Sequence, residues 1–202
     1  MVVCGLYLEF FDENIKMVDL GNNHISNFGR EGVASTKKYL SEAGVDYFGT
    51  PNGPRSATTI INGIKIAFVS YNEFSTQDNE QQSALDEISK VKKDSDVVVV
   101  MCHWGVEYIL KPTNAQKELA HKFVEAGADL IIGGHPHVIE SVEEYMGKKI
   151  YYSLGNFVFD QYGFKNCQDG LGVRVKIYKT SKQIDFEEIH FYMQSNGQTV
   201  EK

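Results

Sequence analysis

Apolar residues fall into two repeating patterns along this chain, and together they predict alternating strands and helices. Short runs rich in β-branched residues are typical of strands buried on both faces, whereas apolar residues three or four positions apart are typical of amphipathic helices. The runs predict strands at residues 14–20, 45–48, 96–101 and 130–132. The helical spacing predicts helices at residues 30–43, 83–93 and 115–126.

The remaining apolar segments predict hairpins. Asn62-Gly63 separates two apolar runs within residues 58–71, and this dipeptide is the strongest short-range signal for a two-residue hairpin turn. Further strands are predicted at residues 138–145, 148–153, 156–160, 172–178 and 184–193. We therefore expect a single α/β domain over residues 1–202, with layered sheets and helices and a terminal β-hairpin and tail at residues 172–202.

Polar side chains follow three of these strands. Asn23 and His24 come after the first, His103 comes after the Val-rich run, and His135 and His137 flank a proline after the strand at 130–132. Ligand sites in α/β sheets lie at the carboxyl ends of strands, and imidazole is a common ligand for transition metals. Each histidine alone has an ordinary explanation as a loop cap or a core residue. Four of them at three strand ends favour a metal site.

Composition narrows the choice of function. The chain has 202 residues, is 42% hydrophobic and carries a net charge of −7, which argues against broad electrostatic binding to nucleic acid or an anionic membrane. Its three cysteines have no paired spacing, so neither a disulfide framework nor a zinc knuckle is predicted. No apolar run reaches the roughly 18 residues of a membrane-spanning helix, and we expect the chain as written to be cytoplasmic. His121 and His190 follow no strand end, and we interpret both as structural.

Four stretches carry a family resemblance. They are Gly-Asn-Asn-His at 21–24, Cys-His-Trp-Gly-Val-Glu-Tyr at 102–108, Gly-Ala-Asp-Leu-Ile-Ile-Gly-Gly-His-Pro-His-Val at 127–138, and Tyr-Ser-Leu-Gly-Asn-Phe-Val-Phe-Asp-Gln at 152–161. In this order they resemble the CapA family, which is associated with bacterial poly-γ-glutamate capsule synthesis and is similar in fold to calcineurin-like metallophosphoesterases. The resemblance implies a layered β-sandwich flanked by helices.

The resemblance also implies roles for the strand-end residues. Asn23, His103 and His135 match ligands of one divalent metal ion, and His137 matches a ligand of a second. His24 matches a residue that stands near the leaving group as a general acid. The metal is Mn, Fe or Zn, and two ions side by side stabilise the attacking and the leaving oxygen of a hydrolysis.

Four neighbouring residues are assigned supporting roles. Asn22 and Trp104 are candidates to support the ligands or to face the substrate; an ordinary turn role is favoured for Asn22, and a role as a wall of the site for Trp104. Glu107 is expected to support the ligands or to face the substrate, and Asn156 is expected to support the metal loop from behind.

The chain departs from the family pattern at its beginning. The family's opening Gly-Asp and Asn-Leu-Glu segments, whose carboxylates hold the second metal and bridge the pair, have no counterpart here. The residues present therefore predict one metal ion, against two in an intact site. The first strands of the sheet are also missing from the pattern, which predicts self-association through exposed strand edges. Two explanations remain open: a fragment, whose missing carboxylates are encoded upstream of Met1, or a degenerate relative of the family.

Three functions remain open from the sequence. The first is a metal-dependent hydrolase of a phosphoester or a γ-glutamyl bond. The second is a non-catalytic component of capsule synthesis or export that binds the anionic polymer and works with other capsule-synthesis membrane proteins. The third is an inactive fragment. Family members are commonly anchored at the outer face of the membrane, so the resemblance also leaves the compartment open.

Overall fold

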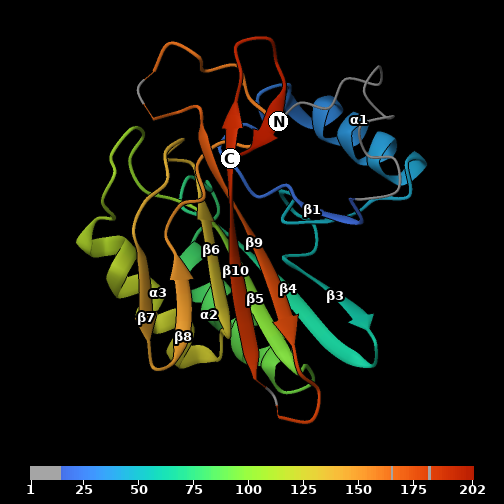
Figure 1. The fold of residues 1–202 in the computed structure, drawn as a ribbon. Helices are drawn as coiled ribbons and strands as arrows, with labels where there is room; N and C mark the ends of the chain where they lie inside the picture. The colour runs from blue at the N-terminus through green and yellow to red at the C-terminus, as the bar shows by residue number, and fades with distance from the viewer. Residues whose placement is uncertain (1–14, 165, 182) are drawn as a thin grey trace. The chain divides into compact units, whose positions relative to one another are not determined.

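The computed structural model describes residues 15–164, 166–181 and 183–202, and Figure 1 shows their helices and strands. The chain divides into two compact units. Of the described residues, the first unit comprises 15–103 and 126–128, and the second comprises those of 104–125 and 129–202. Each unit mixes strands with helices, so the predicted α/β class is confirmed, whereas the predicted single domain stays a prediction.

The first unit begins with a small parallel pair. β1 (Met17–Asp19) pairs with β2 (Asp46–Phe48), and α1 (Gly29–Glu42) connects them. The connection packs on a core of Leu20, Leu40 and Val45. Burial of these side chains sets the path of the chain on both sides of the loop that follows β1.

A hairpin and a crossover complete the first unit. β3 (Ser56–Ile61) pairs antiparallel with β4 (Ile64–Asn72), and both turn residues, Asn62 and Gly63, have positive φ. This is the two-residue turn that the sequence predicts. β4 pairs in parallel with β5 (Val97–His103) through α2 (Glu80–Lys92), which packs against both strands.

The second unit contains one helix and two sets of paired strands. α3 (Asn114–Ala126) precedes β6 (Leu130–Gly134), which pairs in parallel with β8 (Lys148–Tyr151). β7 (Val142–Tyr145) pairs antiparallel with β8. The second set is antiparallel: β9 (Asp169–Ile177), β10 (Ile184–Met193) and β11 (Thr199–Glu201), with β10 in the middle.

Two sequence predictions about strands are wrong. Residues 156–160 form a loop in which Asn156 is buried and residues 157–160 are exposed, because Gly155 turns the chain at φ +71° and no strand among the described residues pairs with the apolar run that follows. β7 begins at Val142 rather than at residue 138, because residues 135–138 form a tight loop. The predicted polar tail also contains one strand, β11, which adds to β10.

Among the described residues, no helix has both the length and the apolar character needed to cross a membrane.

The packing of α2 yields a stability prediction. Ile88 is fully buried where α2 covers β4 and β5. Replacing Ile88 with Ala removes buried methyl groups and leaves a cavity, so we expect the free energy of unfolding to fall by about 2–5 kcal/mol. Urea denaturation measures this change. The exposed Asp86 on the same helix is the control, because Asp86→Ala is expected to change stability by only about 0.5 kcal/mol. Equal effects of the two substitutions would contradict this account of the core.

Candidate metal centre

The loop after β1 is held by the side chain of Asn22. Asn22 Oδ1 accepts a hydrogen bond from the backbone N–H of His24 at 2.9 Å, and Asn22 Nδ2 donates to the carbonyl of Leu20 at 3.3 Å. This is an Asx turn, in which an amide side chain replaces a backbone partner. Asn22 therefore has the turn role expected from the sequence, and it determines the backbone on both sides of Asn23.

Asn23 contacts His103, which ends β5. Asn23 Oδ1 lies 3.0 Å from His103 Nε2, although the two residues are 80 positions apart. The ring of Phe74 meets His103 edge-on at 5.9 Å between ring centroids. The structure thus brings together two of the predicted ligands within the first unit.

A hydrogen bond to His24 determines which ring nitrogen carries the proton. The distance between Asn27 Nδ2 and His24 Nδ1 is 3.0 Å. An amide NH₂ can only donate, so Nδ1 must be the accepting nitrogen, and the proton of the neutral ring is then on Nε2. This tautomer leaves His24 with an N–H that can be donated to another molecule.

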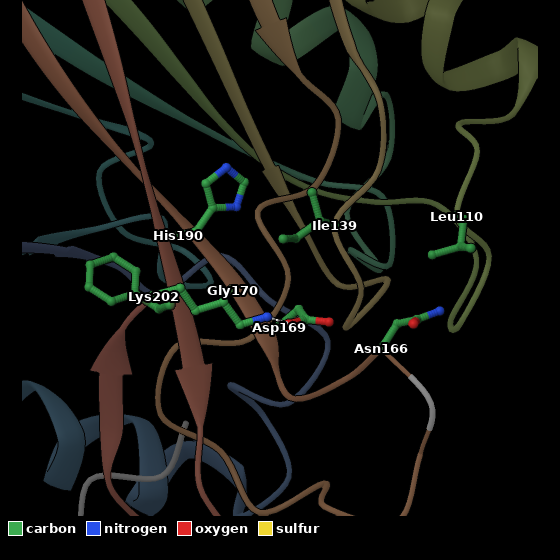
Figure 2. A pocket seen from close by; sticks show the side chains of 8 residues that line it. Leu110, Ile139, Asn166, Asp169, Gly170, His190 and Lys202 are labelled. Atoms are coloured by element: carbon green, nitrogen blue, oxygen red, sulfur yellow. Dashed lines mark hydrogen bonds and ion pairs between the residues drawn. The ribbon is translucent and has the colours of Figure 1, made fainter.

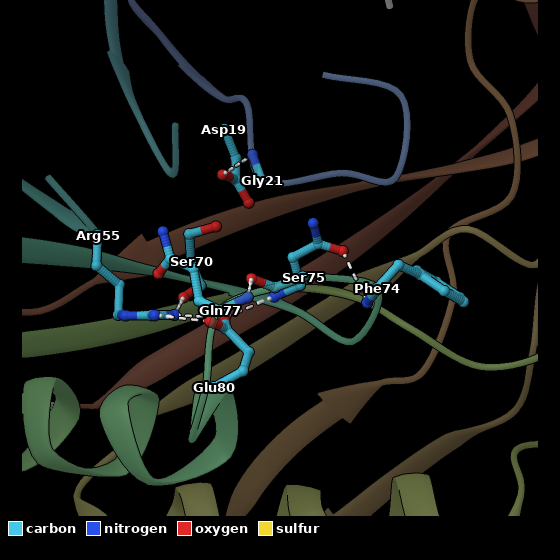
Figure 3. Close-up of polar contacts among 9 residues, drawn as sticks. Asp19, Gly21, Arg55, Ser70, Phe74, Ser75, Gln77 and Glu80 are labelled. Atoms are coloured by element: carbon cyan, nitrogen blue, oxygen red, sulfur yellow. Dashed lines mark hydrogen bonds and ion pairs between the residues drawn. The ribbon is translucent and has the colours of Figure 1, made fainter. Parts of the chain in front are cut away.

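A half-buried carboxyl lies next to this loop (Figure 3). Asp19 Oδ1 accepts from the backbone N–H of Gly21 at 2.9 Å. A Cβ at Gly49 would lie 2.2 Å from Asp19 Oδ1, and one at Gly21 would lie 2.1 Å from Ser70 Oγ. Glycine at both positions therefore makes room for the carboxyl and the hydroxyl.

Burial raises the pKa of Asp19 to about 7. The Gly21 N–H and the Ser70 hydroxyl oppose this shift by hydrogen bonding, and the positive charge of Arg55 opposes it as well. The pKa is raised overall because the free-energy cost of removing the carboxylate from water exceeds the stabilisation that these partners give its charged form.

The Arg55 guanidinium is hydrogen-bonded to both Glu80 and Ser70 (Figure 3). Its guanidinium donates to the two carboxylate oxygens of Glu80 at 2.5 and 2.8 Å and to the carbonyl of Ser70 at 3.1 Å. Glu80 also accepts from the backbone N–H of Asn72 at 3.2 Å. This bidentate pair connects β4 to the start of α2, so the strand that carries Ser70 is held in place.

In the second unit, the loop after β6 has an unusual backbone. His135 has φ +101° and His137 has φ +60°, backbone angles that residues other than glycine rarely adopt. Such residues cost roughly 1–3 kcal/mol each and are concentrated at functional sites. Gly133 is needed for another reason, since a Cβ there would lie 1.9 Å from the carbonyl oxygen of Tyr152.

Neighbouring backbone groups hold this strained loop. Trp104 N–H donates to the carbonyl of Gly134 at 3.1 Å, and Tyr108 N–H donates to the carbonyl of Pro136 at 2.8 Å. The indole of Trp104 is buried and donates to the carbonyl of Tyr152 at 2.8 Å. Trp104 therefore supports the loop from within the unit.

His137 is oriented by Asn156. Asn156 Oδ1 lies 2.8 Å from His137 Nδ1, and Asn156 Nδ2 donates to Gln161 Oε1 and to the carbonyl of Cys167 at 3.2 and 3.0 Å. These two acceptors identify the Asn156 nitrogen, so its oxygen must face the ring. His137 Nδ1 is therefore the protonated nitrogen, and Nε2 keeps the lone pair that a metal ion needs.

Aromatic rings surround His137. Phe159 lies 5.0 Å away and Tyr108 6.1 Å away between ring centroids, and Phe164 stacks on Tyr108 at 4.9 Å. The His135 ring is 6.2 Å from that of His137. Glu107, expected to support the ligands or face the substrate, has an exposed side chain in the loop before Tyr108.

The chemistry of these side chains fits a divalent metal. Asn23 Oδ1 and His103 Nε2 are hydrogen-bonded at 3.0 Å, and the same two atoms lie at the separation of two ligands that each bind one ion at about 2.1 Å, so that a metal would take the place of the shared proton. The described residues contain no group of three or more His, Cys, Asp or Glu side chains arranged to hold an ion. Each unit therefore supplies suitable ligands without a complete set, and the assignment of all four ligands to one centre stays a prediction.

Comparison with known proteins decides the family. The model of the family described as bacterial capsule synthesis protein PGA_cap matches residues 10–161. The chain belongs to this family. The resemblance seen in the sequence is confirmed by CapA, the PGA biosynthesis protein of Bacillus subtilis (strain 168), which is 35% identical over 185 residues. That match covers 83% of this chain and 48% of CapA, and the chain spans about half the length of the curated relatives it matches.

Solved structures confirm the fold. The chain is similar to a phosphatase from Mycoplasma pneumoniae, with a TM-score of 0.54, 15% identity and coverage of 88% of this chain and 93% of the other. It is also similar to the NAD nucleotidase of Haemophilus influenzae, with a TM-score of 0.58, 13% identity and coverage of 94% and 43%. These are metallophosphoesterase-like folds, as the sequence predicted.

A second buried carboxyl, missed in the sequence, lies close to the histidine loop. Glu140 is 3% exposed, its Oε2 accepts from Gln116 Nε2 at 3.2 Å, and its Oε1 has no hydrogen-bond partner among the described residues. Burial raises the pKa of Glu140 to about 7, and the Gln116 bond only partly offsets this. One signal is present in the sequence, where this acidic residue directly follows the apolar Val138 and Ile139.

Glu140 yields a prediction about pH. Its folded-state pKa lies above its usual value of 4.5, so the unfolded chain ionises first and the free energy of unfolding falls as the pH rises from about 4.5 to about 7. Glu140→Gln keeps the shape and an acceptor for Gln116 and cannot ionise. Between pH 5 and pH 8, we expect the free energy of unfolding of the variant to rise relative to that of the wild type by roughly 1–3 kcal/mol.

Urea denaturation at both pH values measures this gain. The exposed Glu118→Gln is the matched control and should show no such gain. Part of the pH dependence should persist in Glu140→Gln because Asp19 is unchanged. A gain of the same size at pH 5 and pH 8 would show that Glu140 is not the titrating group.

Proposed function

We propose that this chain forms part of a CapA-type capsule-synthesis protein that hydrolyses a phosphoester or a γ-glutamyl bond with the help of divalent metal. The observation that carries the proposal is the tautomer of His137, whose Nδ1–H bond to Asn156 leaves Nε2 as a metal ligand. Membership of the capsule-synthesis family and the metallophosphoesterase-like fold support it.

The proposed ligands are Asn23, His103, His135 and His137. Mn, Fe and Zn all accept imidazole and amide oxygen, and the donor types do not choose among them. When bound, such a metal polarises the scissile group and lowers the pKa of water. The chain's own residues orient the ligands, through Asn22 on one loop and Asn156 on the other.

His24 is proposed as the proton donor. With Nδ1 accepting from Asn27, the neutral ring presents Nε2–H as a hydrogen-bond donor. Full transfer of this proton to the departing oxygen or nitrogen starts from the imidazolium, whose Nδ1–H requires the Asn27 amide to turn its oxygen toward the ring. The reverse assignment, with His24 as a metal ligand, would leave the proposed hydrolysis without a positioned acid.

A second function is favoured by one observation. The described residues hold no complete metal-binding group, which agrees with a component that binds the acidic polymer without cleaving it. Such a component would work with other capsule-synthesis proteins at the membrane. An inactive piece of a longer protein is the third outcome that the experiment below separates.

Metal content and turnover test the first function. After incubation with Mn²⁺ and removal of free metal, we expect bound Mn²⁺ and hydrolysis of bis-p-nitrophenyl phosphate or of a γ-glutamyl oligomer. His103→Ala should reduce metal affinity and turnover by at least the roughly 10–100-fold that loss of a supporting residue costs. His121→Ala is the control, because His121 pairs with Glu143 on the surface of the second unit and should leave both unchanged.

The outcomes separate the three functions. Metal or polymer binding without turnover supports the non-catalytic component. Absence of both metal and polymer binding supports the inactive piece. Turnover that His103→Ala leaves intact would overturn the proposed site.

Asn156 yields a separate prediction. Asn156→Ala removes the acceptor that holds the His137 proton on Nδ1, so we expect Mn²⁺ affinity to fall by roughly 10–100-fold. Direct titration of Mn²⁺ measures this without any substrate. Gln161→Ala is the control, since it removes a partner of Asn156 while the bond to Cys167 still orients the amide. An unchanged affinity in Asn156→Ala, with a folded protein by circular dichroism, would contradict the role given to Asn156.

A further inference from the structure

Exposed aromatic side chains contact His137, and the proposed reaction gives them no role. Phe159 and Tyr108 lie 5.0 and 6.1 Å from His137 between ring centroids, and Phe164 stacks on Tyr108 at 4.9 Å with the two ring planes only 7° apart. Tyr108, Phe159 and Phe164 are 39%, 42% and 53% exposed, respectively. We call these three side chains the aromatic rim. All of them belong to the second unit.

The rim is built by two loops that are bonded to each other. Tyr108 lies in the loop before α3, and Phe159 and Phe164 lie in the loop before β9. Gln161 Nε2 donates to the Tyr108 hydroxyl at 3.2 Å, and Tyr108 N–H donates to the carbonyl of Pro136 at 2.8 Å. Tyr108 has φ +67°, a backbone angle that residues other than glycine rarely adopt. Contacts on two sides therefore hold the Tyr108 ring next to His137.

Exposure of the rim indicates a binding surface. Residues 157–159 were predicted to belong to a strand, which would have covered part of this apolar run, but the structure has a loop there. Adjacent apolar side chains that stay exposed are uncommon on soluble proteins and mark sites of interaction. The outer faces of such rings can stack on, or meet edge-on, another planar ring.

The charges beside the rim argue against an acidic occupant. Glu107 precedes Tyr108 and Asp160 follows Phe159, and both acidic side chains are exposed. Among the described residues of the two loops, Lys111 is the one lysine or arginine. A chain with a carboxylate on every unit would bring its charges toward two carboxylates, whereas an uncharged ring is not repelled.

The position of the rim relates its occupant to the candidate metal centre. His137 is a proposed metal ligand, and two rim residues contact its ring directly. An aryl phosphoester carries its ring one bond away from the phosphoryl oxygen. A phosphoryl group bound at His137 therefore leaves the attached ring among the side chains of the rim.

We propose that the aromatic rim binds a planar, uncharged ring on the leaving group of the substrate. The substrate is then an aryl or heteroaryl phosphoester rather than a γ-glutamyl chain. This choice of substrate rests on the proposed hydrolysis, whereas the binding of a ring rests on the rim itself.

A matched control comes from the same loop. Phe157 is 52% exposed, but its ring meets that of Phe191 edge-on at 5.0 Å. Phe191 lines a separate cavity of about 340 Å³, whose wall also includes His190 and Lys202 (Figure 2). The described lining of this cavity contains no residue of the rim. Phe157→Leu thus removes an exposed ring without changing the rim.

Saturation-transfer NMR with phenylphosphonate tests the proposal. The protein is kept in excess EDTA, so that contact of the phenyl ring is measured without metal. We expect saturation of the phenyl protons by the wild type, and we expect the double variant Phe159→Leu, Phe164→Leu to lower it by about threefold or more, because leucine keeps apolar bulk and loses the ring. Phe157→Leu should behave like the wild type. Circular dichroism verifies that both variants are folded.

Calorimetry with Mn²⁺ provides a second measurement. Phenylphosphonate and methylphosphonate share the charged group and differ in the ring. We expect the wild type to bind phenylphosphonate about tenfold more tightly, since the ring buries apolar surface on the rim. The double variant should lose most of this preference and bind methylphosphonate as the wild type does.

Several results would overturn the proposal. They are no saturation of the phenyl protons, equal effects of Phe157→Leu and the double variant, and equal affinity of the wild type for the two phosphonates. Self-association in sedimentation, or binding to phosphatidylcholine vesicles, would also overturn it if the double variant abolished either one. A second copy or a lipid surface would then be the occupant of the rim.

Failure of the hydrolase proposal would look different. Rim-dependent contact of the phenyl ring in EDTA, with no turnover after Mn²⁺ is added, supports the rim and rejects hydrolysis. Metal-dependent turnover of bis-p-nitrophenyl phosphate with the same KM in the wild type and the double variant rejects the rim and leaves hydrolysis standing.

Discussion

The hydrogen bond between His137 Nδ1 and Asn156 Oδ1 is the interaction on which the second unit's chemistry depends. It determines which ring nitrogen carries the proton, and therefore which one is available to a metal. The orientation of the Asn156 amide follows from its nitrogen, which donates to Gln161 and to the carbonyl of Cys167. His137 in turn has a left-handed backbone, whose strain is offset by the hydrogen bonds around it.

Close backbone approach is the second constraint, and glycine makes it possible in both units. In the first, Gly21 and Gly49 leave space for the Asp19 carboxyl and the Ser70 hydroxyl behind the Asn23 loop. In the second, Gly133 allows β6 to approach Tyr152, and Gly170 allows β9 to approach Asn156. A methyl group at any of these positions would displace the backbone or a buried polar group that supports a predicted ligand loop.

Both units also place a carboxyl next to a ligand loop, half-buried in the first unit and buried in the second. Asp19 and Glu140 each have a pKa raised to about 7, chiefly by burial. Keeping such groups costs stability near neutral pH, and a carboxyl of this kind is often retained where a site needs a proton or a fixed polar group. The Asp19 carboxyl has a structural use here, since it binds the N–H of Gly21.

The sequence by itself determined the order and type of most elements, the Asn62-Gly63 turn, the three polar loops at strand ends and the family. These follow from residues that are neighbours in the chain, through apolar spacing and turn chemistry. Tertiary structure decided the rest. Asn23 and His103 are 80 residues apart and His137 and Asn156 are 19 apart, so no local pattern reveals their hydrogen bonds or the tautomers that result. The same reason explains why residues 156–160 were mistaken for a strand. Strand pairing and burial depend on partners elsewhere in the chain, and only the folded protein brings them together.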